Sequence, residues 1–146
     1  MTVQIFVYGT LKPGEINYQL LCQDRVLASY RAIARGHLYY LPPLGYPGMT
    51  EANGWVEGAL LVFPDETIFE RLDPLEDYQA SREATVNEYN RKIIDIFHLD
   101  QTPFTQAWAY FMSPAKIKFY QGIFLPAGIW HSADFTSDRP LHSLLN

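Results

Sequence analysis

The hydrophobic pattern of the chain begins almost at its first residue. Residues 3–8 read Val-Gln-Ile-Phe-Val-Tyr, so β-branched and aromatic side chains recur with a period of two. This alternation predicts a buried strand. It ends at Gly9-Thr10, and Pro13-Gly14 adds a second turn signal. A glycine at this break allows a ligand to approach the main chain, and turn N–H groups can bind an anion or a developing oxyanion. The same pattern is also typical of a strand that simply turns.

Further strands follow along the chain. They are expected at Ala32–Leu41, Trp55–Phe63, Lys92–Leu99 and Gln106–Met112, the last two separated by a turn around Asp100–Pro103. Gly58 lies inside the second of these stretches and predicts a bulge or a close backbone approach. Leu41–Gly48 contains three prolines, which cannot donate ladder hydrogen bonds, and is therefore expected to be a loop.

Two short helices are expected. Apolar residues at helical spacing predict the first over about Asn17–Gln23. The second is expected to begin at Asp65, which can cap its N-terminus, and to end at about Asp73, because Pro74 restricts the residue before it. Its apolar face is expected to comprise Ile68, Leu72 and Leu75.

The pattern decays beyond Ser113. The stretch Gly128-Ile129-Trp130 predicts a last short docking element, and residues 135–146 are expected to be a loose tail. Five or six strands joined mostly by short loops predict an α+β fold, with a mixed sheet that curls into a small barrel beside a few short helices. We expect residues 1–146 to form one such domain.

Composition narrows the functional classes. The chain has 146 residues, of which 48% are apolar and 15% aromatic, enough for a hydrophobic core without disulfides. The net charge of −5, without a basic cluster, argues against a nucleic-acid or anionic-membrane partner. No charged-then-apolar leader and no apolar run of about 18 residues is found. With a single cysteine, Cys22, these features predict a cytoplasmic protein.

Several segments together resemble one known family. Residues 6–14, Phe-Val-Tyr-Gly-Thr-Leu-Lys-Pro-Gly, resemble the opening signature of the γ-glutamylcyclotransferase-like family, which includes γ-glutamylamine cyclotransferases and AIG2-like proteins. Further matches occur in order at residues 46–48, 55–63, 69–78 and 107–110. The resemblance runs from residue 5 to about residue 130 and implies a compact barrel whose site lies where the loop after the first strand meets the helix after the third.

The resemblance also implies a reaction and its residues. Family members convert γ-glutamyl compounds to 5-oxoproline and a free amine, because the substrate's own α-amine attacks its γ-carbonyl. By position, Glu76 matches the catalytic acid/base of the family. The substrate-binding residues are expected to be Tyr8, Gly9, Thr10, Leu11, Tyr46 and Tyr110. The implied partner is a small γ-glutamyl substrate, and no cofactor or metal is implied.

The match departs from the family in one segment. The family usually has glycine or another small residue after the catalytic glutamate, where this chain has Asp77. The family's Tyr-x-Arg appears here as Tyr89-Asn90-Arg91, further downstream than is typical, which predicts an inserted turn.

Other interpretations of these residues remain open. A glutamate at a helix end, such as Glu76, is usually a solvated cap, and Asp73 is more typical of a structural carboxylate than of a second acid. Cys22 could be a nucleophile beside one of the four histidines, although no local signature marks it. No metal-binding or nucleotide-binding motif is found. Two further functions are possible on this fold: a binding module without turnover, and a γ-glutamyl amidohydrolase that uses water.

Overall fold

The computed structural model describes residues 1–135 and has an α+β fold, as the sequence predicts. The strands are β1 (Val3–Val7), β2 (Ala28–Leu41), β3 (Tyr46–Phe63), β4 (Asn90–Phe97), β5 (Pro103–Phe111) and β6 (Ile123–Phe124). The helical segments are η1 (Tyr18–Cys22), η2 (Glu66–Ile68), α1 (Phe69–Leu75), α2 (Pro114–Phe119) and η3 (Ser132–Phe135). In the described part of the chain, no helix is long and apolar enough to cross a membrane.

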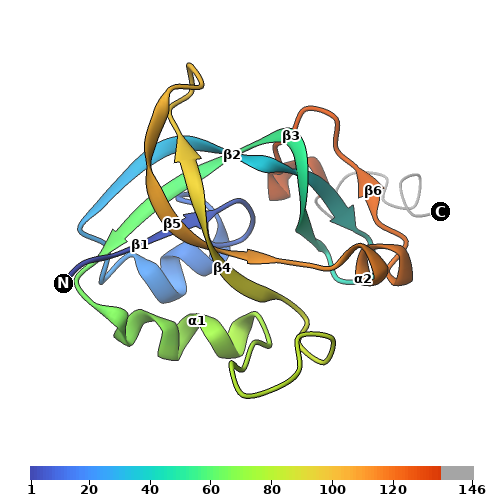
Figure 1. The fold of residues 1–146 in the computed structure, drawn as a ribbon, viewed down its shortest axis with the longest axis horizontal. Helices are drawn as coiled ribbons and strands as arrows, with labels where there is room; N and C mark the ends of the chain where they lie inside the picture. Colours follow the sequence, from blue (N-terminus) through green and yellow to red (C-terminus); the bar gives the residue numbers. More distant parts are fainter. Residues whose placement is uncertain (136–146) are drawn as a thin grey trace.

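The six strands form one mixed sheet that curls into a partly closed barrel (Figure 1). Their order is β3-β1-β5-β4-β2-β6, and β3 also pairs with β2, which brings the two sides of the sheet together. Two contacts in this circuit are short. The parallel pairing of β1 with β5 is limited to Ile5 and Trp108. The antiparallel pairing of β2 with β4 is limited to Ile33 and Phe97.

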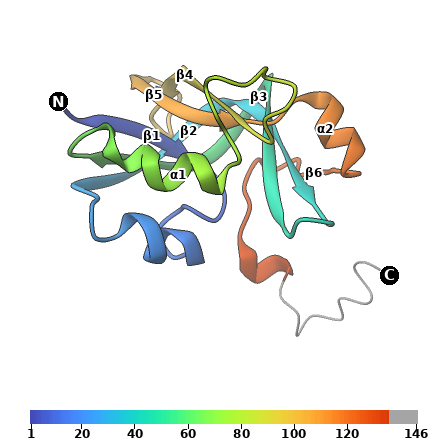
Figure 2. The ribbon, with the colours of Figure 1, turned by 90° about the horizontal axis from the view of Figure 1, so that it is seen from below.

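Strand β1 is buried on both faces. Val3, Ile5 and Val7 join the core cluster that includes residues of η1 and α1, and Figure 2 shows these two helical segments on one side of the sheet. Phe6 and Tyr8 join a second cluster with residues of β2, β3, β4 and β5. The alternation in the sequence therefore separates two apolar environments rather than core from solvent.

Gly58 marks a close backbone approach. A Cβ atom at this position would lie 2.1 Å from the carbonyl oxygen of Val7, so only glycine lets β1 pair with β3 here. This confirms one of the two alternatives predicted for Gly58. The register shift in the β2–β3 ladder lies elsewhere, between Arg35 and His37.

The predicted loop at residues 41–48 is too long. The turn of the β2–β3 hairpin is confined to residues 42–45, and Pro47 pairs with Tyr40 inside β3. Proline is tolerated because the Pro47 carbonyl accepts from the Tyr89 hydroxyl rather than from β2. Its nitrogen, on the same side of an antiparallel strand, therefore owes no hydrogen bond to the ladder.

The prediction that Pro74 ends its helix is also wrong. Asp65 caps the segment as predicted, because its carboxylate accepts from the N–H of Thr67, but α1 continues through Pro74 to Leu75. The backbone N–H of Glu76 still donates to the carbonyl of Leu72, so the last turn forms despite the missing proline donor. Of the predicted apolar face, Ile68 and Leu72 are buried, whereas Leu75 is 40% exposed.

The chain beyond Ser113 is more ordered than its pattern suggests. The Ser113 hydroxyl caps α2 and Pro114 occupies its first turn, a combination typical of a helix start that the sequence analysis missed, together with β6. Phe135, at the start of the expected tail, lies in η3 and stacks on Tyr40. The remaining residues of that expected tail, 136–146, lie outside the described residues.

The stretch 128–130 docks as predicted. The Gly128 carbonyl accepts from the N–H of Glu57 at 2.7 Å, and Trp130 is buried. The Trp130 carbonyl accepts from the ammonium group of Lys12, which is itself buried. Burial lowers the pKa of Lys12, although carboxylates nearby oppose the effect.

Candidate active site

The end of β1 and the end of α1 meet at one narrow cavity of about 40 Å³. It is lined by Phe6, Val7, Tyr8, Gly9, Thr10, Leu11, Tyr46, Pro47, Glu76, Tyr89 and Tyr110. All seven residues that the sequence assigns to the site are among them. The predicted meeting of Glu76 with the turn after β1, more than sixty positions earlier, is confirmed as geometry, whereas the chemical roles stay a prediction.

The turn after β1 lines the cavity through Gly9, Thr10 and Leu11. The carbonyl of Gly9 accepts from the N–H of Lys12, and the carbonyl of Thr10 accepts from the N–H groups of Asn17 and Tyr18. Within residues 1–135, no protein acceptor is found for the N–H groups of Gly9, Thr10 and Leu11. Three consecutive free donors are able to bind a carboxylate or an oxyanion.

Pro47, across the cavity, leaves no room for a side chain at Gly9. A Cβ atom here would lie 2.9 Å from Cγ of Pro47, closer than side chains tolerate. The turn therefore approaches the β3 hairpin as tightly as backbone allows, which keeps the cavity narrow.

Glu76 directly follows α1 and is half-buried, with its carboxylate on the cavity. Among the described residues, no protein donor is within hydrogen-bond distance of this carboxylate. Burial, and then the charge of Asp73, raises the pKa of Glu76 to about 8. A carboxyl group with this pKa can both take and return a proton near neutral pH.

Asp73, three residues earlier, is held as a structural carboxylate. Its oxygens accept from the Arg91 guanidinium at 3.0 and 3.2 Å, and from the Tyr110 hydroxyl at 2.6 Å. With its acceptor sites engaged, Asp73 is suited to join α1 to β4 and β5, which favours the structural interpretation over a second acid.

The tyrosine hydroxyls are engaged away from Glu76. Tyr8 donates to the main-chain carbonyl of Tyr110 at 2.7 Å, and Tyr89 donates to the carbonyl of Pro47 at 2.7 Å. Burial raises the pKa of Tyr8, Tyr89 and Tyr110. The hydroxyls of Tyr8 and Tyr110 therefore make no hydrogen bond to Glu76 within the described residues, and both residues line the cavity.

Comparison with known proteins adds the family. Residues 5–132 match the family described as "Gamma-glutamyl cyclotransferase, AIG2-like". The chain belongs to this family.

Individual relatives agree with that assignment. A Vibrio cholerae protein, named provisionally as a gamma-glutamylcyclotransferase, is 34% identical over 73% of this chain and 78% of its own length. A Niallia circulans protein, named gamma-L-glutamyl-butirosin B gamma-glutamyl cyclotransferase, is 38% identical over 51% of this chain, which spans only 46% of that relative. The crystal structure of an AIG2-like protein from Mus musculus shares the fold, with a TM-score of 0.66, 21% identity, and coverage of 89% of this chain and 88% of that one.

The structure explains where this member departs from the family pattern. Asp77, in the position where the family usually has a small residue, adopts a positive φ of 50°, the left-handed conformation that glycine adopts most easily after a helix. Arg82 donates to both the carbonyl and the carboxylate of Asp77. These bonds hold the aspartate in that conformation, which Asp tolerates better than most residues.

Four wall residues escaped the sequence analysis as site residues: Phe6, Val7, Pro47 and Tyr89. Tyr89 carried a signal, because it begins the family's Tyr-x-Arg. Its partner Arg91 lies outside the cavity and binds Asp73. Pro47 carried the Tyr-Pro-Gly match but was assigned to a loop.

Cys22 is excluded as a nucleophile by its surroundings. It is fully buried in the core, away from the cavity, and burial raises its pKa to about 12, the opposite of what a reactive thiolate needs. In residues 1–135, no group of three or more His, Cys, Asp or Glu residues is placed to hold a metal ion.

Proposed function

We propose that this chain is a cyclotransferase that closes the γ-glutamyl group of a small amine or peptide to 5-oxoproline and releases the free amine. One observation carries the proposal: the half-buried carboxylate of Glu76, which has no protein donor among residues 1–135, shares a narrow cavity with Gly9, Thr10 and Leu11, whose N–H groups have no protein acceptor in the same range. Family membership and the names of the two curated relatives support the same class of reaction.

The proposed step needs only groups that the cavity offers. The substrate's α-amine nitrogen forms a bond to its own γ-carbonyl carbon, and the bond from that carbon to the leaving nitrogen breaks. Glu76 takes the proton from the attacking amine and delivers it to the leaving nitrogen, so no water or cofactor is consumed. The N–H groups of residues 9–11 hold the α-carboxylate or the developing oxyanion.

Geometry supplies the rest of the rate enhancement. Ring closure is intramolecular, so the protein must hold the folded substrate conformer rather than a second reactant. We expect the narrow cavity to take the reacting γ-glutamyl portion, with the amine portion toward solvent.

The single cysteine is buried and free, consistent with a reducing compartment, and we place the activity in the cytoplasm.

The test compares wild type with Glu76→Gln on γ-glutamyl amines, γ-glutamyl-amino acids and glutathione, with 5-oxoproline release as the readout. The variant keeps the size of the side chain but cannot accept the proton. Turnover should fall by about 10²- to 10⁴-fold, whereas the affinity for a γ-glutamyl ligand should change much less. Thermal melts should show that the variant is folded.

Glu70→Gln is the matched control, because Glu70 is an exposed carboxylate on the same helix and should leave turnover unchanged. Full activity in folded Glu76→Gln would refute the role of Glu76. Release of glutamate instead of 5-oxoproline would show a hydrolase, and ligand binding without any product would show a binding module.

A further inference from the structure

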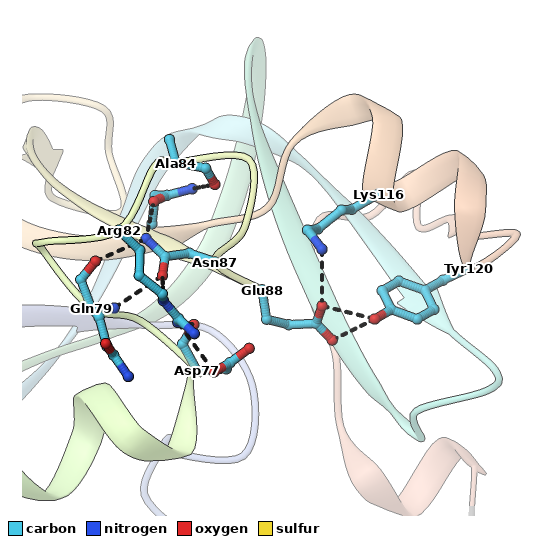
Figure 3. A network of polar contacts seen from close by, with 9 residues as sticks. Asp77, Gln79, Arg82, Ala84, Asn87, Glu88, Lys116 and Tyr120 are labelled. Atoms are coloured by element: carbon cyan, nitrogen blue, oxygen red, sulfur yellow. Dashed lines mark hydrogen bonds and ion pairs between the residues drawn. The ribbon is translucent and has the colours of Figure 1, made fainter.

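The loop that follows Glu76 has its own framework of polar contacts (Figure 3). Asn87 is almost fully buried at 1% exposure and is the centre of this framework. Its side chain exchanges hydrogen bonds with the main chain of Gln79 and accepts from Arg82 at 2.7 Å. The long connection from α1 to β4 is therefore a shaped structure, not a loose insertion.

The end of this loop returns to the residue that carries the proposed acid/base. The N–H of Glu88 donates to the carbonyl of Asp77 at 3.1 Å, and the N–H of Tyr89 donates to the carbonyl of Glu76 at 3.3 Å. These two consecutive bonds join residues 88–89 to residues 76–77. The main-chain position of Glu76 thus depends on what holds residues 88 and 89.

Glu88 and Tyr89 are held by hydrogen bonds to two different elements: Tyr89 to the β3 hairpin, and Glu88 to the region of α2. The Tyr89 hydroxyl donates to Pro47 on the β3 hairpin, as described above. The Glu88 carboxylate accepts from the Tyr120 hydroxyl at 2.7 and 2.6 Å and lies 3.5 Å from the Lys116 ammonium (Figure 3). This bond to Glu88 is the main cause that raises the pKa of Tyr120 to about 12.

The anchor on α2 is itself fixed to the cavity hairpin. Ile117 of α2 is buried, and its Cδ1 would lie 3.1 Å from a Cβ atom at Gly48, the residue after Pro47. Tyr120 follows α2 directly, and its N–H donates to the carbonyl of Lys116. The Tyr120 hydroxyl therefore has a defined place relative to the cavity wall.

We propose that Glu88 and Tyr120 are positioning residues for Glu76, because their hydrogen bond fixes the segment whose main chain holds the Glu76 carbonyl. This inference rests on the proposed function for its kinetic consequence, but it also has a consequence that needs no turnover. If the bond is lost, residues 88–89 lose one of their two anchors, and the Glu76 carboxylate gains access to water.

The kinetic test is Tyr120→Phe, which removes one hydroxyl and keeps the ring. We expect kcat for 5-oxoproline release to fall by about 10-fold or more, because small displacements of a catalytic group are costly, while KM changes much less. Tyr39→Phe is the matched control: Tyr39 contacts the same region through Phe124, and its hydroxyl makes no hydrogen bond within the described residues. Its kcat should match wild type.

The second test follows the Glu76 carboxyl group by ¹³C NMR titration, with Glu76→Gln for assignment. In Tyr120→Phe the pKa of Glu76 should fall from about 8 toward its ordinary value, because the carboxylate becomes hydrated. The titratable groups that interact with Glu76 in the structure are Asp73, Tyr8, Tyr46, Tyr89 and Tyr110. None of them is altered by the substitution.

Conservative rescue separates positioning from simple destabilisation. Glu88→Gln keeps an oxygen that accepts from Tyr120, so it should retain more turnover and a higher Glu76 pKa than Glu88→Ala. A Glu76 titration that is unchanged in Tyr120→Phe would overturn the inference, even if that variant melts at a lower temperature. Absence of turnover in wild type would refute the proposed function. Even then, a lower Glu76 pKa in Tyr120→Phe than in wild type would support the positioning role.

Discussion

Two carboxylates one helical turn apart have different environments and therefore different uses. Asp73 is bound by a guanidinium and a phenol, whereas Glu76 has no protein donor within the described chain and lies on the cavity. An ion pair keeps a carboxylate charged, and burial without a partner favours the neutral form. The local partners, not the residue type, therefore distinguish the structural acid from the candidate catalytic one.

The unpaired carboxylate should make stability depend on pH. The folded protein holds the Glu76 proton up to a pKa of about 8, whereas the unfolded chain releases it near the ordinary value of 4.5. Between these values the folded state binds more protons, so the contribution of Glu76 to the free energy of unfolding falls as pH rises. Glu76→Gln removes this loss, and its Tm relative to wild type should therefore increase steadily from about pH 4.5 to about pH 8.

Calorimetric melts across this range check the expectation. Glu70→Gln, at an exposed position on the same helix, is measured in parallel as the surface variant. A constant Tm difference between Glu76→Gln and wild type would contradict the buried, unpaired state of Glu76.

Single positions in the site were predictable where a motif marked them. The turn at Gly9 and the glutamate at position 76 carried local signals, and the structure brings both to one cavity. Hydrogen-bond partners were not predictable, because they depend on distant segments. The Tyr110 hydroxyl binds Asp73, 37 positions earlier, and no pattern around either residue indicates that contact.

Between elements, Arg91 of β4 joins α1 to the sheet. Besides its two bonds to Asp73, its guanidinium carbon lies 3.9 Å from the ring centre of Phe69 and 4.9 Å from that of Trp108. A planar guanidinium can stack and bind in a bidentate manner, which an ammonium cannot do. Arg91→Lys should therefore lower the free energy of unfolding by about 1–3 kcal/mol.

Urea unfolding followed by tryptophan fluorescence measures this effect, with Arg31→Lys as the control. Arg31 pairs with Glu57, but its side chain is 72% exposed, and surface pairs contribute little. Equal losses in the two variants would show that stacking and bidentate geometry contribute nothing at Arg91.

Short elements were the hardest to predict. Helix α2 has six residues, too few for a helical period to emerge, yet Ser113-Pro114 and Gly122 mark its two ends. Pro47 was wrongly predicted to lie in a loop, although it belongs to β3. A proline usually indicates a loop, but the nitrogen of Pro47 faces away from the β2–β3 ladder, so no ladder hydrogen bond is lost there.

Across the whole molecule, the barrel has two weak seams. The β2–β3 hairpin pairs along nearly its full length, whereas β1–β5 and β2–β4 each meet at one residue pair. Because opening free energy follows local hydrogen bonding and burial, the seams should open before the hairpin. Native-state hydrogen exchange should show amides bonded across the seams exchanging at least about tenfold faster than the amides of Leu60 and Leu61, which are buried in the long ladders of β3 with β1 and β2.

Uniform protection of all strands would contradict this order of opening.

The sequence could predict some features of the fold but not the order of its strands. Strand content and a mixed, curled sheet followed from alternation and loop length. The order in which strands pair did not, because β1 contacts β5, about a hundred residues later, through side chains that any buried strand could offer.

The contact between Lys12 and the carbonyl of Trp130 has a consequence for how the protein is made. The turn after β1 leaves the ribosome well before residue 130, so its ammonium group is covered only when residue 130 has emerged. Strand β1 also lacks both partners until β3 and β5 have been translated. The nascent chain therefore carries the turn after β1 in an unfinished form from its own synthesis until that of residue 130, and the cavity that this turn lines cannot form before β3 and β5 have joined β1.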